Sequence, residues 1–423
     1  MKHIVIENLG PIKKVDIELK RFNFFIGPQS CGKSTIAKVI STCEWMEKEV
    51  TTLLDEKAIP NGVVFVEMVE KFHKMEGYFN RPLNTHIHYE TEVIDICYKD
   101  KELSVCLKKE EAYHRQKICY IPAERNMVTL PELDGFEFGQ TNLKSFLFDW
   151  WRARELHSTD NKMDILGLGM HYYYDKSRDS KKDRIQHDNG VSYDISLSNS
   201  SSGLQSVTPL YIMLDYYADK YFEEYNAKSS FIDESKMART RIALQQKYIF
   251  PYISSPSDSK DQLIEKIDNY VNSLHLGDPK CTEIHRGYLV AFKRMTEPNR
   301  TTFIIEEPEQ NLYPSAQIEL LQSIVSLCNG VRNHGFTITT HSPYILNYLN
   351  VMIMRNMRSV TDKPSIDAEG MNVYAVQNGG VLDLIQANTV TGFKSVNAEW
   401  LNEAMRSMFC EYKELKGKDA GIC

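Results

Sequence analysis

A glycine-bounded loop that ends in Lys-Ser-Thr is the first stretch of the sequence whose residue types and spacing can do chemistry. Its residues are Gly27, Pro28, Gln29, Ser30, Cys31, Gly32, Lys33, Ser34 and Thr35. At this spacing backbone N–H groups can cradle phosphates, the lysine can reach the β- and γ-phosphates, and the first hydroxyl can ligate Mg²⁺. The pattern predicts binding of ATP, or another nucleoside triphosphate, with Mg²⁺. A glycine turn that carries a surface lysine is the alternative.

Two adjacent carboxylates provide a second candidate group. Glu306 and Glu307 follow the apolar run 301–305, which is too short for a helix and typical of a buried parallel strand. Adjacent carboxylates at the end of a core strand are costly unless they meet a cation or water. We expect Glu306 to hold Mg²⁺ and Glu307 to act as the general base toward the attacking water.

Four further residues are candidates for phosphate contact. His341 follows the apolar stretch 335–340 and is placed to donate a hydrogen bond to the γ-phosphate, the alternative being a structural histidine. Arg125 follows the strand-like run 118–121 and is a candidate phosphate or switch residue, the alternative being a structural salt bridge with a nearby carboxylate. Ser202 and Gly203 lie in a polar loop before an apolar helix, whose N-terminus favours anions.

The elements that must position these residues follow from hydrophobic periodicity. Apolar residues 22–26 predict a buried strand before the loop, and helical periodicity after the loop predicts a helix that points its N-terminus at the nucleotide. Residues 2–8 and 14–19 alternate apolar and polar around Gly10-Pro11, which predicts a hairpin. The expected fold is therefore α/β, a P-loop NTPase with a mixed sheet and an antiparallel β subdomain.

We expect a discontinuous head domain with a helical insertion. The head comprises residues 1–210 and 300–423 and contains a β-rich subdomain at about 85–110 and 170–196. Residues 211–299 are mainly helical in pattern, without sustained heptads, and form the insertion or lid.

Composition is that of an ordinary globular chain. Of the 423 residues 42% are hydrophobic and 25% charged, and the formal net charge of −7 offers no global attraction to nucleic acid or to anionic membranes. The nine cysteines lack C-x-x-C spacing, and no apolar run is long enough for a membrane span. These features predict a cytoplasmic protein with reduced thiols and no membrane partner.

The order of the motifs resembles that of the ABC-type ATPases. The resemblance is to the soluble branch that contains RecF, the structural-maintenance-of-chromosomes (SMC) proteins and the OLD ATPases. The OLD-like comparison is strengthened by the segments 6–12, 120–125 and 307–314. This resemblance implies that Ser202 and Gly203 belong to a signature loop that contacts ATP on a second subunit, that 309–312 form the D-loop, and that His341 is the switch histidine. A head-to-tail homodimer, or a higher oligomer, would follow.

The same resemblance suggests what the ATPase controls. About 80 residues follow His341 and lack an Asp-x-Asp cluster, so we expect no built-in TOPRIM nuclease. The chain looks like the stand-alone ATPase subunits of bacteriophage-defence systems, which act with a separately encoded nuclease or toxin. The alternatives are a DNA-repair or chromosome-associated ATPase that acts directly on DNA, and an ATP-gated scaffold with little hydrolysis.

Overall fold

The computed structural model describes residues 2–80, 84–130, 139–188, 192–227, 234–255, 257–387, 392–397 and 399–420. A six-stranded sheet in the order β15-β14-β3-β13-β12-β7 lies at its centre, and every pair of neighbours is parallel except β14 and β15. Its strands are β3 (Phe22–Ile26), β7 (Gln116–Ile121), β12 (Arg300–Glu306), β13 (Gly335–Thr340), β14 (Met371–Gln377) and β15 (Gly380–Asp383). All five residues of β3 are buried, because packed elements cover both faces of the sheet.

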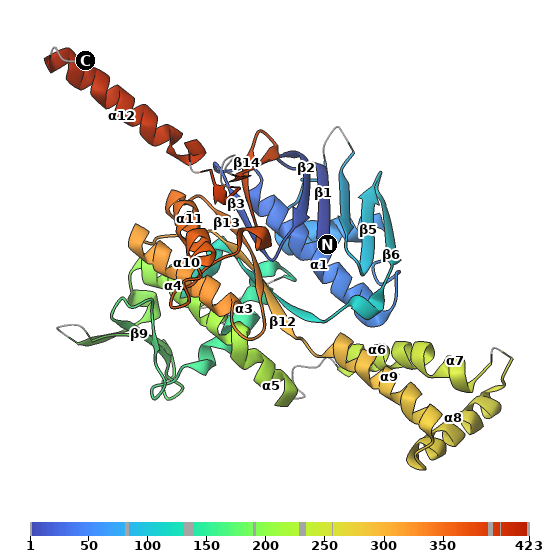
Figure 1. The fold of residues 1–423 in the computed structure, drawn as a ribbon. Coiled ribbons are helices and arrows are strands. Elements are labelled where there is room, and N and C mark those ends of the chain that lie inside the picture. Colours follow the sequence, from blue (N-terminus) through green and yellow to red (C-terminus); the bar gives the residue numbers. More distant parts are fainter. Residues whose placement is uncertain are drawn as a thin grey trace.

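Helices cover one face of this sheet. They are α3 (Asn142–Ala153), α4 (Ser202–Asp215), α5 (Tyr221–Ala227), α10 (Pro314–Cys328) and α11 (Pro343–Met357). Side chains from these helices share one apolar core with Phe24, Phe303 and Ile338 of the sheet. In Figure 1 helices α10, α11, α3 and α4 group on the side of the central strands away from α1.

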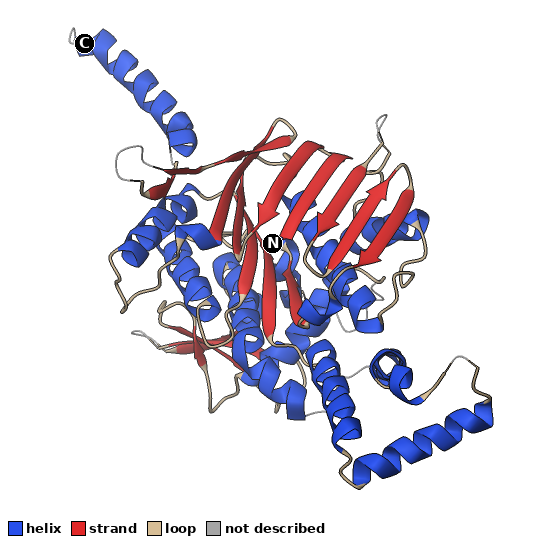
Figure 2. Ribbon diagram, turned by 45° about the vertical axis from the view of Figure 1, so that its right-hand side comes forward, coloured by secondary structure: helices blue, strands red, loops and turns tan. Residues whose placement is uncertain are grey.

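The long helix α1 (Lys33–Leu53) lies on the other face, between the central sheet and a second sheet. The second sheet is antiparallel, in the order β2-β1-β4-β5-β6, and stands beside the central sheet in Figure 2. Its strands are β1 (Lys2–Leu9), β2 (Ile12–Leu19), β4 (His86–Glu90), β5 (Ile94–Lys99) and β6 (Glu102–Leu107). The predicted hairpin is confirmed, since β1 pairs with β2 from Lys2↔Leu19 to Leu9↔Ile12. The short helix α2 (Gly62–His73) also packs on this side.

The β-rich segments that we expected to form one subdomain lie in two different sheets. Residues 86–107 belong to the antiparallel sheet on the α1 side, whereas β8 (Met163–Asp164), β9 (Met170–Tyr174), β10 (Asp183–His187) and β11 (Tyr193–Ser196) pair among themselves. Tyr172 and Ile185 of the latter strands pack into the core on the opposite face. Alternation along a strand shows that one face is buried but not against which element, so the sequence pattern could not separate the two sheets.

The expected insertion also differs in extent. An aromatic cluster lies where α4 continues into α5. Its members Tyr216, Tyr217 and Phe222 are buried in the core against the central sheet, so this part of the expected insertion belongs to the head. Within the expected insertion, the described helices that project from the head are therefore α6 (Glu234–Tyr248), α7 (Phe250–Ile253), α8 (Lys260–His275) and α9 (Pro279–Thr296). This helical arm extends away from both sheets in Figures 1 and 2.

The C-terminal part completes the fold. Strands β16 (Ile385–Ala387) and β17 (Lys394–Val396) form a small ribbon, and α12 (Glu399–Ala420) extends alone from the head in Figure 1. Of the helices in the described ranges, none has both the length and the apolar character that crossing a membrane requires.

Candidate nucleotide site

The glycine-bounded loop connects β3 to α1, and its two glycines are required by geometry. Gly27 has φ 156°, and a Cβ there would lie 2.3 Å from the carbonyl oxygen of Val376. Gly32 has φ 108° and precedes α1, and a Cβ there would lie 2.3 Å from Cδ1 of Ile12. Both contacts are shorter than a side chain tolerates, so the close turn between strand and helix depends on glycine at both positions.

Lys33, the first residue of α1, turns back into the loop. Its Nζ donates to the carbonyl oxygens of Gly27 at 2.9 Å and Pro28 at 2.7 Å, and lies 3.5 Å from Nδ1 of His341. Burial lowers the pKa of Lys33, while the neighbouring Cys31 and Glu307 act in the opposite direction. The loop therefore concentrates a cation and the N-terminal N–H groups of a helix at one point, an arrangement that favours anions.

Glu307 and His341 meet because β12 and β13 are parallel neighbours in register. Glu306 lies opposite Thr339, so both strands end at the same edge of the sheet as the loop. The backbone N–H of Glu307 donates to the carbonyl oxygen of Thr339 at 2.8 Å, and Oε1 of Glu307 lies 3.4 Å from Nε2 of His341. The structure thus brings together the side chains of Lys33, His341 and Glu307.

Glu306 is directed toward the edge strand β7. Its side chain is buried, Oε1 accepts a hydrogen bond from the hydroxyl of Tyr120 at 2.5 Å, and Oε2 receives only a long bond of 3.4 Å from the N–H of Ala123. Ser34 follows Lys33 at the start of α1. Hydroxyl and carboxylate oxygens are ligands that Mg²⁺ accepts, so this donor set fits the ion.

Two further residues contact the site: Tyr120, to which the sequence assigned no role, and Glu309, which the resemblance placed in the D-loop. Burial, reinforced by Glu306, raises the pKa of the Tyr120 phenol, which remains a hydrogen-bond donor. Oε1 of Glu309 accepts from the backbone N–H of His341 at 2.6 Å, and its buried Oε2 has no partner among the described residues. Burial raises the pKa of Glu309. Glu309 is the third carboxylate of the run Glu306-Glu307-Pro308-Glu309, so the sequence indicated a further acid near the site. Nothing in the sequence around Tyr120 indicated that its hydroxyl contacts Glu306.

Arg125 does not have the position that we predicted for it. The side chain is fully buried, and its guanidinium donates to the backbone carbonyl oxygens of Pro122, Ser206, Glu306, Glu307 and Pro308. All these partners belong to the chain itself, and the predicted phosphate contact is therefore wrong. The structural alternative holds in a modified form, because Arg125 joins carbonyl groups at the end of β7, in the first turns of α4 and at the end of β12, instead of a carboxylate.

Ser202 and Gly203 open α4 beside the loop that follows β12. Ser201 caps this helix by accepting from the N–H of Leu204. A Cβ on Gly203 would lie 2.9 Å from the carbonyl oxygen of Asn311, whose side-chain Nδ2 donates to Oγ of Ser206 at 2.9 Å. Among the described residues no hydrogen bond joins Ser202 or Gly203 to residues 27–35 of the same chain.

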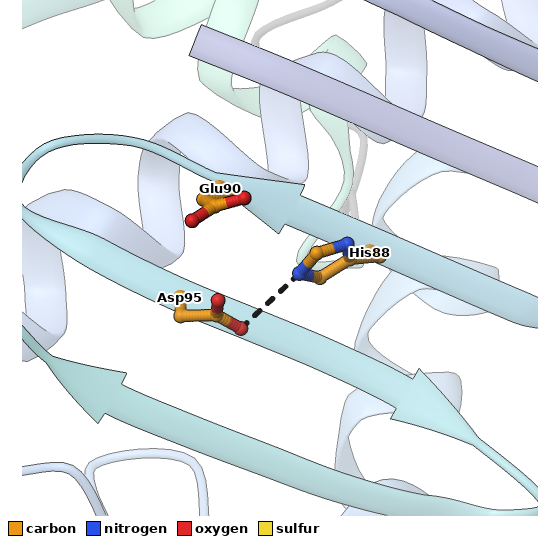
Figure 3. A group of neighbouring side chains, drawn as sticks. All are labelled: His88, Glu90 and Asp95. Carbon is orange, nitrogen blue, oxygen red and sulfur yellow. Dashed lines mark hydrogen bonds and ion pairs between the residues drawn. The ribbon is translucent and has the colours of Figure 1, made fainter. Parts of the chain in front are cut away.

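A separate group of possible metal ligands lies on the antiparallel sheet. His88, Glu90 and Asp95 of β4 and β5 approach one another, and Nε2 of His88 lies 3.3 Å from Oδ1 of Asp95 (Figure 3). Lys108 contacts Glu90 at 2.5 Å and Asp95 at 3.4 Å. The Lys108 ammonium pairs with both carboxylates, so this group is an ion-pair cluster on a sheet surface.

Comparison with known proteins gives one family match and a set of structural similarities. The model of the AAA ATPase domain matches residues 284–346, and no curated protein matches. The SMC head domain from Thermotoga maritima has a TM-score of 0.37 at 8% identity, with 90% of this chain and 97% of that chain covered. The recombination mediator protein RecF has a TM-score of 0.29 at 11% identity, with 90% and 97% covered. An ATP-binding cassette of an ABC transporter has a TM-score of 0.30 at 11% identity, with 90% of each chain covered.

The matched segment contains strands β12 and β13. Glu306, Glu307 and His341 lie at the carboxyl ends of these strands, on the same side of the sheet as the phosphate loop. Strand order, loop and match together confirm the predicted P-loop NTPase fold. Residues 284–346 are thus similar to an AAA ATPase domain, and the OLD-like assignment remains a prediction.

Proposed function

We propose that the protein is a Mg²⁺-dependent ATPase that works as a head-to-tail dimer. One observation carries this proposal, the convergence of Lys33, at the start of the helix that follows β3, with His341 and Glu307 at the ends of the neighbouring strands β13 and β12. A cation, a hydrogen-bond donor and a carboxylate at one sheet edge are the groups that phosphoryl transfer to water needs.

Each side chain has a distinct task in this proposal. The N–H groups of residues 28–34 and the Lys33 ammonium bind the β- and γ-phosphates, with phosphate oxygens replacing the carbonyl partners of Nζ. Ser34 and Glu306 would hold Mg²⁺, which neutralises developing charge on the phosphates. Glu307 orients and deprotonates the attacking water, and His341 donates to the γ-phosphate.

Glu307 is held for this task by its own backbone. Its φ of 45° is rare for a residue with a side chain and costs on the order of 1 kcal/mol. Hydrogen bonds at both its N–H and its carbonyl, the latter from Arg125 at 2.7 Å, maintain that conformation. Strain retained at this position supports a role beyond packing.

The dimer is inferred from the position of Ser202 and Gly203. They adjoin residues 309–312 and have no hydrogen bond to the loop of their own chain, so a second copy would be the recipient of their contact. Control of a separate nuclease or toxin, and a role in bacteriophage defence, rest on the family resemblance alone. The same proposal includes a division into a head and a helical insertion, in which the insertion passes the nucleotide state of the head to the effector.

Phosphate release from ATP tests the catalytic assignment. We expect Lys33→Ala and Glu307→Gln each to lower Mg²⁺-dependent turnover by about 100-fold or more. Glu307→Gln should retain ATP binding, because the substitution removes the base and leaves the loop intact. The matched control is Glu319→Gln, an exposed carboxylate of α10, which should turn over ATP at the wild-type rate. Wild-type turnover in both site variants would refute the assignment.

A further inference from the structure

A cavity of about 310 Å³ lies beside the edge strand β7, away from the phosphate loop. Its walls come from α1, α2, β7, α3 and the start of α5. The α1 residues that line it, from Ser41 to Lys48, lie roughly 12 to 22 Å along the helix from Lys33, given the rise of an α-helix. The cavity is therefore distinct from the proposed catalytic site.

The charged residues of the lining are all cations. Lys48, Arg115 and Lys117 line the cavity, and no described residue of the lining carries a carboxylate. Lys117 is paired with Asp149 at 2.6 Å, but Lys48 is only 3.9 Å from Glu49, which pairs with Lys236 at 2.9 Å. The Arg115 guanidinium has no hydrogen bond or ion pair with a described residue. A second cavity of about 170 Å³ shares Lys48 and Arg115.

The pKa of Lys48 reflects the positive charge around it. Burial lowers its pKa to about 7, and Arg115, Lys117 and Lys236 contribute in the same direction while Glu49 opposes them. Arg115 has no counter-charge from a described residue in this partly buried space, and Lys48 shares Glu49 with Lys236, which raises the free energy of the folded state. An anion bound between Lys48 and Arg115 would remove that cost.

Five aromatic residues also line the cavity, beside small polar and aliphatic ones. Trp45, Phe72, His73, Tyr120 and Tyr221 contribute rings. A cavity of this volume with aromatic walls and a few convergent polar groups is typical of small-molecule sites. Planar rings stack on such side chains, and phosphate groups bind arginine and lysine. We propose that this cavity is a second, non-catalytic site for a small phosphorylated molecule with an aromatic ring, of the nucleotide class.

Tyr120 connects this cavity to the proposed catalytic site. Its ring lines the cavity, and its hydroxyl donates to Oε1 of Glu306 at 2.5 Å. A ligand that contacts the ring therefore acts on the carboxylate proposed to hold Mg²⁺. This coupling, unlike the binding itself, rests on the proposed ATPase function.

Binding is tested on the full chain with Lys33→Ala, so that the phosphate loop no longer contributes. Isothermal titration with AMP should detect a site in this protein, and addition of Lys48→Gln and Arg115→Gln should weaken AMP binding by about tenfold or more. The matched control is Lys71→Gln, an exposed lysine of α2, which should leave the affinity unchanged. Equal affinity in all three proteins would overturn the proposal.

Two further probes determine what the cavity recognises. Inorganic phosphate should bind more weakly than AMP, because the aromatic walls then contribute nothing. A 5′-phosphorylated single-stranded oligonucleotide should bind no more tightly than AMP. Preference for phosphate, or tighter binding of the oligonucleotide, would contradict a nucleotide-sized ligand.

Turnover tests the coupling separately. AMP should change the ATP turnover of the wild-type protein by about twofold or more and should affect Arg115→Gln less, while the basal rates of the two agree. An equal response in both would refute the coupling. If AMP does not bind to the cavity but ATP turnover is normal, this inference fails and the proposed function stands. If AMP binds but ATP is not hydrolysed, the proposed function fails and the second site stands.

Discussion

Arg125 is the residue whose role changes most once its surroundings are known. It is fully buried, and burial lowers its pKa to about 10, so it remains a cation at neutral pH with Glu309, Glu307 and Glu306 nearby. Its partners include the carbonyl oxygens of Glu306 and Glu307, at 2.8 and 2.7 Å. Arg125 is therefore a positioning residue for the acidic turn and has no contact with substrate in this proposal.

We expect Arg125→Met to lower the free energy of unfolding by about 3 kcal/mol or more, because several buried carbonyl groups lose their donor. Arg125→Lys should recover part of this loss, since an ammonium can satisfy some of these oxygens. Urea denaturation measures both variants. In the lysine variant kcat should fall while KM stays near the wild-type value, because Glu307 is displaced but the phosphate loop is intact. A stable, fully active Arg125→Met protein would contradict this role.

Packing between elements fixes the loop after β12 against the start of α4. The contact is close enough that Gly203 has no space for a Cβ beside the carbonyl oxygen of Asn311. By contrast, Gly287 in α9 of the helical arm has no neighbour within 4 Å of its Cβ position. Alanine substitutions at the two glycines therefore distinguish the effect of close packing from the effect of helix propensity.

Gly203→Ala should destabilise the protein by about 1 to 3 kcal/mol, because the added Cβ forces α4 and residue 311 apart. Gly287→Ala should instead stabilise it by about 0.5 to 1 kcal/mol, since alanine is the better helix former and meets no obstacle. Thermal denaturation of both variants measures the difference. Two shifts of the same sign would contradict this account of the α4 contact.

At the scale of the whole molecule, the proposed dimer predicts complementation between two inactive variants. Lys33→Ala removes the phosphate loop function from one chain, and Ser202→Arg blocks the exposed start of α4 in the other. A mixed dimer keeps one complete site, so an equal mixture should recover about a quarter of the wild-type turnover if chains exchange freely. Turnover measured after mixing and incubation gives the result. If each chain held a complete site, Ser202→Arg alone would stay active and mixing would give the average of the two rates.

The sequence by itself determined the local parts of this protein. Spacing within residues 27–35 specified the phosphate loop, because its geometry depends on consecutive backbone groups and on two glycines. Apolar runs that end in Glu306, Glu307 and His341 predicted strand ends, and parallel pairing then brought these residues to one sheet edge. The fold class followed from the same periodicities.

Only the tertiary structure decided which distant segments meet. The donors of Arg125 reach carbonyl groups 81 and 181 residues away, and Tyr120 reaches Glu306 across 186 residues. The assignment of 86–107 and 163–196 to different sheets, and the burial of Tyr216 and Tyr217 ahead of the helical arm, have the same cause. Strand alternation and helical periodicity record that a face is buried but carry no information on its partner. Long-range packing supplies that partner, and with it the cationic cavity beside β7.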